Sequence, residues 1–470
     1  MISEMYKDMF QAARHAALHP DRYLASDGRM LFPPIAYDRF TQTEKIGSGT
    51  PTYIGNTGDM NMAMPIHTKD LYHGWPIVQY DDVAYGSLFL ANTGPNDKLV
   101  LADSAGFNKE LVPKIRASLA TIGVAVAQNV EYTNSIAQWL IENNPTAISP
   151  YMPSPRVLEP FSEHPAKLVD INIALYTKSG FALFCNEHGI PIPDTVIGRY
   201  MGRTRGIFEA ANRISTTAKE FVLSTEGDTS GEGVFFAKGK ELSEKLAQNF
   251  HYGENYTLQE KLDVETSPCM RVYIGDEPDK NVIIGVTRQR LVNGGYAGNV
   301  WHEEIEEKLS AYDPDFMKVH EKLITELQRA GVRGVVNIDS MIIRDAKNGG
   351  YKTVLRELNA RKAFSHPLGR MIEQGNIDGQ SIRRIQTKYK VDIPMDFIRN
   401  EDFIQQLNQF CDPTSRVVFL TRSPDEYNEE TGKTQSYGYL VFASSNADSE
   451  DNLDDIQAKT LAFIANYQRA

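Results

Sequence analysis

The stretch that decides the fold is VVNIDSMIIRD (335–345) followed, after the loop AKNGG (346–350), by TVLRELNAR (353–361). Both segments alternate in the way that β-strands do, and a glycine-rich connection between them predicts a hairpin. Residues i and i+2 of a strand share a face, so Glu357 and Asn359 point the same way, and pairing of the two strands lets Asp339 join them. Two carboxylates and an amide oxygen form an all-oxygen site suited to Mg²⁺ (or Mn²⁺) on nucleotide phosphates. The alternative is a solvated strand face whose carboxylates pair with Lys or Arg.

Basic residues follow this hairpin directly. Arg361 and Lys362 precede the sequence Ser365-His366-Pro367. Two cations next to an acidic pair can neutralise a transferring phosphoryl group or an acyl-phosphate. Ordinary surface charge is the competing interpretation, and a lone histidine such as His366 is more often a structural hydrogen-bonding residue than a catalyst.

A glycine-rich loop, EGDTSGEG (226–233), lies between two apolar segments upstream. Because a strand leads in and VFFA (234–237) leads out as another strand, the pattern predicts a hairpin rather than a P-loop, which would lead into a helix. The glycines allow a backbone that exposes several N–H groups to a phosphate, and hydroxyls can add donors. A turn without a ligand is equally compatible with the sequence. The residues that would form the phosphate flap are Gly227, Thr229, Ser230, Gly231 and Gly233.

The order of predicted elements indicates a mixed α/β (α+β) protein. LVLAD (99–103), a helix over 109–121, VAVAQ (124–128) and a helix over 134–144 follow one another, which is typical of a parallel βαβ unit. We therefore expect an N-terminal Rossmann-like domain that ends in a proline-rich linker. The four expected domains are residues 1–165, 166–256 with the glycine loop, 257–395 with the acidic hairpin, and 396–470 as a small α/β C-terminal extension.

Composition narrows the class of protein. The chain has 470 residues, a net charge of −12 and 41% hydrophobic residues, which is an ordinary globular balance and argues against a general nucleic-acid binder. No apolar run approaches the roughly 18–20 residues that cross a bilayer, and the N-terminus lacks the features of a secretory signal. Three distant cysteines, Cys185, Cys269 and Cys411, form neither a disulfide framework nor a metal knuckle. We therefore expect a cytoplasmic protein without nucleic-acid or membrane partners.

Five blocks stand in one order along the chain: KSGFALFCNEHGIPIP (178–193), TEGDTSGEGV (225–234), SPCMRVYI (267–274), TRQRLVNGGYAGNV (287–300) and ELNARKAFSHP (357–367). In that order the chain resembles the ATP-grasp superfamily, and more narrowly the pheganomycin-type peptide ligases, which carry a pre-ATP-grasp N-terminal domain. A related branch loads amino acids onto acyl-carrier proteins.

The resemblance implies an ADP-forming ligase: ATP and Mg²⁺ phosphorylate a carboxylate, and an amine or a carrier thiol then displaces phosphate. It implies roles for the residues that match its motifs. Lys178 would bind the α/β-phosphates, the segment Glu260, Lys261 and Leu262 would bind adenine, and Asp339, Glu357 and Asn359 would hold the metal. Arg361 would contact the γ-phosphate or acyl-phosphate, and Arg271 or Arg288 would hold the substrate carboxylate. Small-molecule carboxylate, amine or peptide substrates follow from it, an acyl-carrier protein is a further partner that it allows, and so is a homodimer.

One family residue is missing. A second lysine normally stands on the strand that enters the glycine loop, where it touches the α-phosphate, but Leu223 and Ser224 occupy that region here. This gap favours a nucleotide-binding protein without ligase turnover as the rival of a different class. A kinase-like phosphotransferase on the same fold is the third reading of the motifs, and a requirement for both a carboxylate and an amine in ADP release separates the three.

Overall fold

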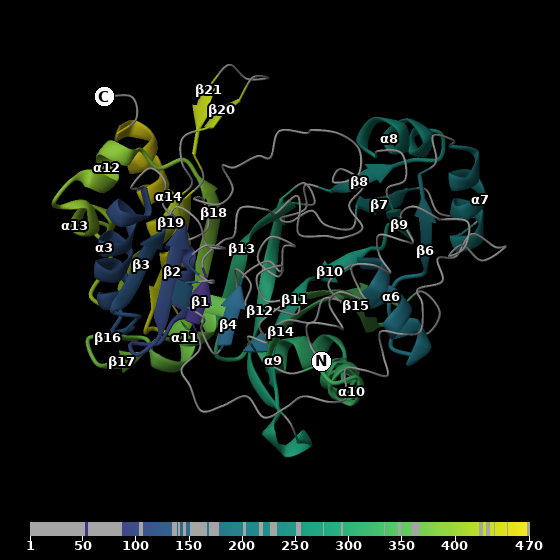
Figure 1. Cartoon of the computed structure of the whole chain (residues 1–470), viewed down its shortest axis with the longest axis horizontal. Coiled ribbons are helices and arrows are strands. Elements are labelled where there is room, and N and C mark those ends of the chain that lie inside the picture. The colour runs from purple at the N-terminus through teal and green to yellow at the C-terminus, as the bar shows by residue number, and fades with distance from the viewer. Residues whose placement is uncertain are drawn as a thin grey trace.

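The computed structural model describes residues 52–54 and 87–467 apart from short gaps within that range. The gaps are 103–106, 134–138, 140–141, 144–146, 151–166, 169–177, 201–203, 216–219, 226–232, 251–254, 276, 293–294, 333, 346–348, 360–365, 423–425, 429–432, 437 and 449. The described chain is a mixed α/β protein in which three sheets of four to nine strands are joined (Figure 1), so the predicted fold class is confirmed.

The largest sheet runs through the middle of the molecule and is antiparallel throughout (Figure 1). In spatial order its strands are β10 (Val264–Thr266), β14 (Gly334–Arg344), β11 (Pro268–Ile274), β12 (Val282–Val292), β13 (Gly295–His302), β18 (Arg384–Val391), β22 (Gly438–Ser444) and β19 (Ser415–Arg422), and β15 (Tyr351–Asn359) pairs with β14. β14 and β15 form the hairpin that the alternating pattern predicts.

One face of the β11–β15 region is closed by helices. They are α6 (Lys178–Glu187), α9 (Ile305–Tyr312) and α10 (Phe316–Arg329). Phe181 of α6 and Leu323 of α10 are buried in one apolar cluster with Ile338 of β14. Because successive strand residues point to opposite faces, the polar residues Asp339 and Glu357 are left on the other face of the sheet.

A four-stranded antiparallel sheet forms a separate lobe (Figure 1). Its strands are β6 (Thr195–Arg199), β9 (Asn255–Glu260), β7 (Phe221–Thr225) and β8 (Val234–Ala237), and its helices are α7 (Arg205–Ile214) and α8 (Glu241–Asn249). β7 and β8 pair as a hairpin, so the strand–glycine loop–strand prediction is confirmed. The helices cover one face of this sheet, and the other face remains to line a cavity.

The N-terminal part is a parallel sheet. Its spatial order is β3 (Asn129–Thr133), β2 (Lys98–Ala102), β1 (Thr52–Ile54), β4 (Ala147–Pro150) and β5 (Lys167–Leu168), and α3 (Phe107–Ala120) connects β2 to β3. The predicted βαβ unit is confirmed, but the predicted strand at 124–128 is wrong. Val124 donates its N–H to Leu119 O (3.2 Å) as the helix ends, and Ala127 donates its N–H to the Thr93 side chain (Oγ1, 2.9 Å), so these hydrogen bonds replace sheet pairing there. The sheet strand comes immediately afterwards.

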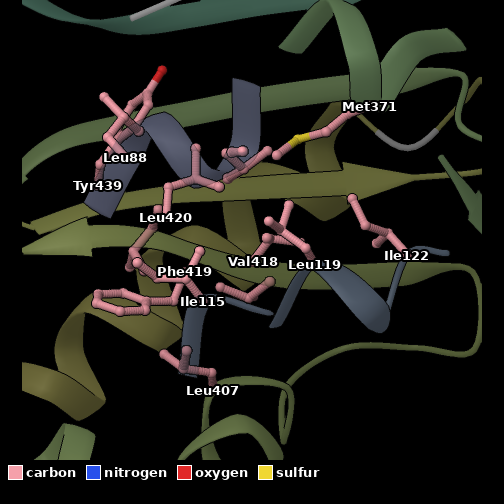
Figure 2. Close-up of a cluster of buried hydrophobic side chains, with 14 of the residues drawn as sticks. Leu88, Ile115, Leu119, Ile122, Met371, Leu407, Val418, Phe419, Leu420 and Tyr439 are labelled. Atoms are coloured by element: carbon pink, nitrogen blue, oxygen red, sulfur yellow. The ribbon is translucent and has the colours of Figure 1, made fainter. Parts of the chain in front are cut away.

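The N-terminal unit and the C-terminal residues share one hydrophobic core (Figure 2). Leu119 of α3 packs with Phe419 of β19 in this core, and the Phe419 N–H donates to Ser118 Oγ at 2.7 Å. Around it lie the 3₁₀ helix η4 (Ser87–Asn92), α11 (His366–Gln374), α12 (Met395–Arg399), α13 (Phe403–Leu407) and α14 (Glu450–Tyr467). The domain boundaries remain predictions, but β19 and β22, which the sequence assigns to a C-terminal extension, extend the central sheet.

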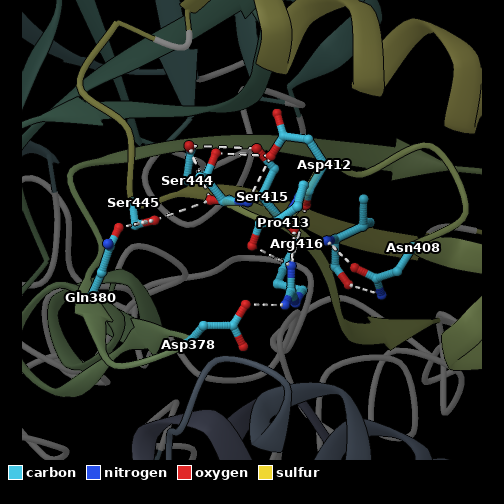
Figure 3. Close-up of polar contacts among 11 residues, drawn as sticks. Asp378, Gln380, Asn408, Asp412, Pro413, Ser415, Arg416, Ser444 and Ser445 are labelled. Carbon is cyan, nitrogen blue, oxygen red and sulfur yellow. Dashed lines mark hydrogen bonds and ion pairs between the residues drawn. The ribbon is translucent and has the colours of Figure 1, made fainter.

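Polar contacts fix the beginning of β19 (Figure 3). Arg416 pairs with Asp378 (Nη2–Oδ2, 3.1 Å) in the turn between β16 (Asn376–Ile377) and β17 (Gln380–Ser381), and it also donates to the carbonyl of Pro413 (3.0 Å). The small hairpin of β20 (Glu426–Asn428) and β21 (Lys433–Gln435) follows the other end of β19 and projects from the molecule far from the β16–β17 turn (Figure 1). Across the described residues, no helix is long and apolar enough to span a bilayer.

Candidate nucleotide-binding site

A cavity of about 500 Å³ lies between the four-stranded sheet and the β14–β15 hairpin. Several predicted site residues line it together with residues that the motifs do not single out. They are Lys178, Ser224, Phe236, Glu260, Lys261, Leu262, Met341, Arg356 and Glu357. Segments about 180 residues apart in sequence, at Lys178 and Glu357, thus meet at one cavity.

Lys178 lies at the beginning of α6, on the cavity wall next to β7. Its Nζ donates a hydrogen bond to the carbonyl of Thr225 (2.9 Å). Strand alternation places the neighbouring residues of β7 on opposite faces: Leu223 is fully buried beneath the lobe's helices, whereas Ser224 lines the cavity. A lysine at position 224 would therefore point into the cavity, whereas a lysine at position 223 would point into the core.

The segment from Glu260 to Leu262, at the end of β9, lines the cavity. Lys261 donates its N–H to Glu220 O (3.0 Å) on the β7 side. In an extended chain the backbone groups of the two flanking residues point to the opposite edge, beyond the end of β6, where Thr195 pairs with Gln259. A carbonyl of Glu260 and an N–H of Leu262 on one edge can match the acceptor and donor edge of a nucleobase. The Lys261 ammonium itself pairs with Glu220 (2.5 Å) and lies 5.2 Å from the centre of the Phe236 ring.

The pairing of β14 with β15 brings the acidic residues of the hairpin next to each other. Asp339 lies directly opposite Glu357, and Asn359 Nδ2 donates to Asp339 Oδ2 (3.3 Å). Burial first, and then the neighbouring Glu357 carboxylate, raise the pKa of the Asp339 carboxyl from 3.8 to about 6. Two carboxylates held side by side, with an amide oxygen within reach, are a donor set that fits a hard divalent cation. Among the described residues no three His, Cys, Asp or Glu side chains converge, so such a cation would rest on two carboxylates and the Asn359 amide.

Two residues of this site were not identified from sequence. Gln289 on β12 donates its Nε2 to Asp339 Oδ1 at 2.9 Å, across the intervening strand β11. Arg356 lines the cavity beside Glu357. Gln289 lies inside the block at 287–300, but the resemblance gives it no role. For Arg356 the sequence did contain a signal: Leu355 and Leu358 are three residues apart, which does not fit the two-residue alternation of a regular strand and indicates a bulge.

The other predicted residues differ in position: Arg271 lies on the same sheet face as Asn359, Arg288 lies on the opposite face, and several lie outside the described residues. The guanidinium of Arg271 is fully buried against Gly285, where an added Cβ would come within 2.9 Å of Nη2, and burial lowers the pKa of Arg271 to about 10. Arg288 is exposed, and strand alternation turns it away from the face that carries Gln289. Gly233 precedes β8, and its carbonyl accepts a hydrogen bond from Thr225 N (2.9 Å). Arg361, Gly227, Thr229, Ser230 and Gly231 lie outside the described residues.

Comparison with solved structures shows which fold this is. The chain is similar to an ADP complex of N5-carboxyaminoimidazole ribonucleotide synthetase (TM-score 0.53, 13% identity, covering 90% of this chain and 99% of that one). It is similar to the Staphylococcus aureus N5-carboxyaminoimidazole synthetase complexed with ADP (TM-score 0.54, 12% identity, 90% and 100% covered). It is also similar to the Aspergillus clavatus enzyme in complex with ADP and 5-aminoimidazole ribonucleotide (TM-score 0.53, 8% identity, 89% and 99% covered).

These neighbours are ATP-grasp ligases, and the described part of the chain has the ATP-grasp fold. No protein-family model matches the sequence, and no curated protein sequence matches it. At 8–13% identity the likeness concerns the fold, and the pheganomycin-type branch remains a prediction from the sequence blocks.

Proposed function

We propose that this protein is an ATP-dependent, ADP-forming carboxylate–amine ligase that makes an amide or peptide bond through an acyl-phosphate. The observation that carries the proposal is the single cavity that Lys178, the Glu260–Leu262 backbone and Glu357 line together. A metal–nucleotide complex needs three kinds of group: a cation for its phosphates, a donor and an acceptor for its base, and carboxylates for its metal ion.

Each group has a definite part in the proposed reaction. The Lys178 ammonium reaches the end of β7 and would bind nucleotide phosphate, while Glu260 O and Leu262 N–H would bind adenine. Asp339, Glu357 and Asn359 would hold Mg²⁺ or Mn²⁺, which supplies charge neutralisation for phosphoryl transfer. Arg361 and the residues 227–233 keep the phosphate-contacting roles that the family resemblance implies. The protein positions the carboxylate and excludes water, so that an amine rather than water attacks the acyl-phosphate.

Two experiments test this function. Calorimetry should show ADP binding to the full-length protein, weakened about 10–100-fold by Lys178→Ala, because a charge-assisted hydrogen bond contributes about 1.5–3 kcal/mol. ADP release should then be screened over pairs of carboxylates and amines. Release that requires both substrates supports a ligase, release with one hydroxyl or carboxylate acceptor alone supports a phosphotransferase, and absence of nucleotide binding contradicts the proposal.

A nucleotide-binding protein without turnover is the second candidate. The observation that favours it is Ser224, a neutral residue on the cavity wall where the family pattern places a lysine. The Asp339–Glu357 pair supports the ligase instead, since a protein that only bound the nucleotide would have little use for two adjacent carboxylates whose mutual repulsion is costly. ADP binding without ADP release over the whole substrate screen would favour the binder.

The proposal also concerns the acceptor, which is the molecule that displaces phosphate from the acyl-phosphate. Resemblance to the pheganomycin-type ligases favours a free amino acid or peptide amine, and the carrier-protein branch offers a thiol. A thiol acceptor forms a thioester, which neutral hydroxylamine cleaves, whereas an amide resists it. Product analysis after hydroxylamine treatment therefore distinguishes the two acceptors.

A further inference from the structure

We infer that Arg356 is a phosphate-binding residue of the cavity and supplies the positive charge that Ser224 lacks. The inference rests on the proposed nucleotide site, and it assigns a residue to that site which neither the sequence motifs nor the comparisons identify. It follows from a β-bulge in β15 and from the partners of Lys178 and Lys261, the other two cations discussed for the cavity.

A β-bulge turns Arg356 into the cavity. The pairing of β14 with β15 runs from Asp339–Glu357 to Ser340–Leu355, so one residue of β14 is matched by two residues of β15 and Arg356 is the extra one. Leu355 and Leu358 are both fully or almost fully buried in the core beneath the sheet. Residues three apart in an uninterrupted strand would point to opposite faces, and the bulge is what allows both leucines to face the core. Arg356 and Glu357 consequently both line the cavity on the other side.

Among the described cations that line the cavity, Arg356 differs from Lys178 and Lys261 in its hydrogen bonds and ion pairs. Lys178 donates to Thr225 O, and Lys261 is paired with Glu220 at 2.5 Å. Within the described part of the chain, no hydrogen bond or ion pair engages Arg356, although it is half-buried. Desolvating a guanidinium without a partner is unfavourable, and a phosphate in the cavity would relieve that cost through bidentate hydrogen bonds.

The position of Arg356 suits phosphate better than base. It neighbours Glu357, whose carboxylate belongs to the candidate metal group, whereas the Glu260–Leu262 edge that would bind the base is on a different strand of the other sheet. A nucleotide bound between the two sheets would therefore meet Arg356 at the metal and phosphate end.

The test compares Arg356→Met with Arg344→Met in the full-length protein. Arg344 lies on the same hairpin, at the exposed end of β14, and does not line the cavity. ADP and adenosine are titrated calorimetrically into each protein, with EDTA and with Mg²⁺. We expect Arg356→Met to weaken ADP binding about 10–100-fold, to leave adenosine binding within about twofold, and Arg344→Met to change neither. Arg356→Lys should retain part of the ADP affinity, and Ser224→Lys in the Arg356→Met background should restore it.

The outcomes separate this inference from the proposed function. If the wild-type protein binds ADP and Arg356→Met binds it equally well, the inference is overturned and the nucleotide site stands. If ADP and adenosine lose affinity in parallel, Arg356 supports the base or the shape of the cavity, and its phosphate role is also overturned. If the wild-type protein binds no adenine nucleotide, the proposed function itself fails. Circular dichroism and thermal unfolding of each variant show whether a loss of binding arises from misfolding.

Discussion

Placing a lysine at residue 224 should strengthen nucleotide binding, and placing it one residue earlier should destroy the lobe. Ser224 lines the cavity, so a lysine there can extend toward bound phosphate while its stem lies along the cavity wall. A new charge-assisted hydrogen bond contributes about 1.5–3 kcal/mol, and we expect the low end because Lys178 and Arg356 already carry positive charge nearby. Ser224→Lys should therefore tighten ADP binding about tenfold, or roughly 1.4 kcal/mol.

Leu223→Lys is the matched control. Leu223 is fully buried with Phe221 and Leu258 beneath α7 and α8. Replacing it removes about 1.5–3 kcal/mol of apolar burial and adds the larger cost of a buried, unpaired ammonium. Thermal unfolding should show a large loss of stability for Leu223→Lys and little change for Ser224→Lys. A stable Leu223→Lys, or a folded Ser224→Lys with wild-type ADP affinity, would refute the placement of residue 224 at the phosphates.

Three further predictions follow from single residues. Glu357→Gln should remove most ADP-releasing turnover while the thermal midpoint stays near that of the wild type, because the change removes one charge of the metal group without altering side-chain volume; near-normal turnover would remove Glu357 from that group. Gln289→Leu should weaken binding of Mn²⁺·ADP about tenfold with little effect on metal-free ADP, because Gln289 orients Asp339, and equal losses in both titrations would indicate a structural role only. His320 is buried with Nδ1 hydrogen-bonded to Phe316 O (2.8 Å), and burial lowers its pKa from 6.5 to about 4, so the unfolded chain binds the proton more readily. The contribution of the neutral imidazole to the free energy of unfolding is complete above pH 6.5 and falls as the pH approaches 4, by about 2 kcal/mol at pH 5. In urea titrations, the free energy of unfolding of His320→Leu should therefore decrease less between pH 7 and pH 5 than that of the wild type. An equal decrease in both proteins would contradict a buried neutral imidazole.

Local periodicity was enough to predict most individual elements. The alternation in 335–345 and 353–361 predicted the β14–β15 hairpin and the shared face of Glu357 and Asn359, because strand geometry relates sequence spacing directly to faces. The prediction was wrong at 124–128, where apolar residues fill the core from an irregular segment, since an apolar run indicates burial but not sheet pairing.

The way the segments combine was decided by tertiary structure. Residues 415–422 and 438–444 had the pattern of strands, but only long-range pairing through β18 made them part of the central sheet, and only packing against α3 joined them to the N-terminal unit. Pairing between strands far apart in sequence depends on which apolar faces can be buried together, and a local pattern contains no information on that choice.

The candidate site divides in the same way. The sequence by itself determined the chemical types: an acidic hairpin face, a lysine before a glycine-proline segment and a glycine-rich loop in a fixed order. Only the folded chain determined that Ser224 rather than Leu223 faces the cavity, that a bulge places Arg356 beside Glu357, and that Gln289 reaches Asp339 across another strand. The physical reason is that the orientation of a strand residue depends on register and on bulges, and both are set by the partner strand and by the core that it covers.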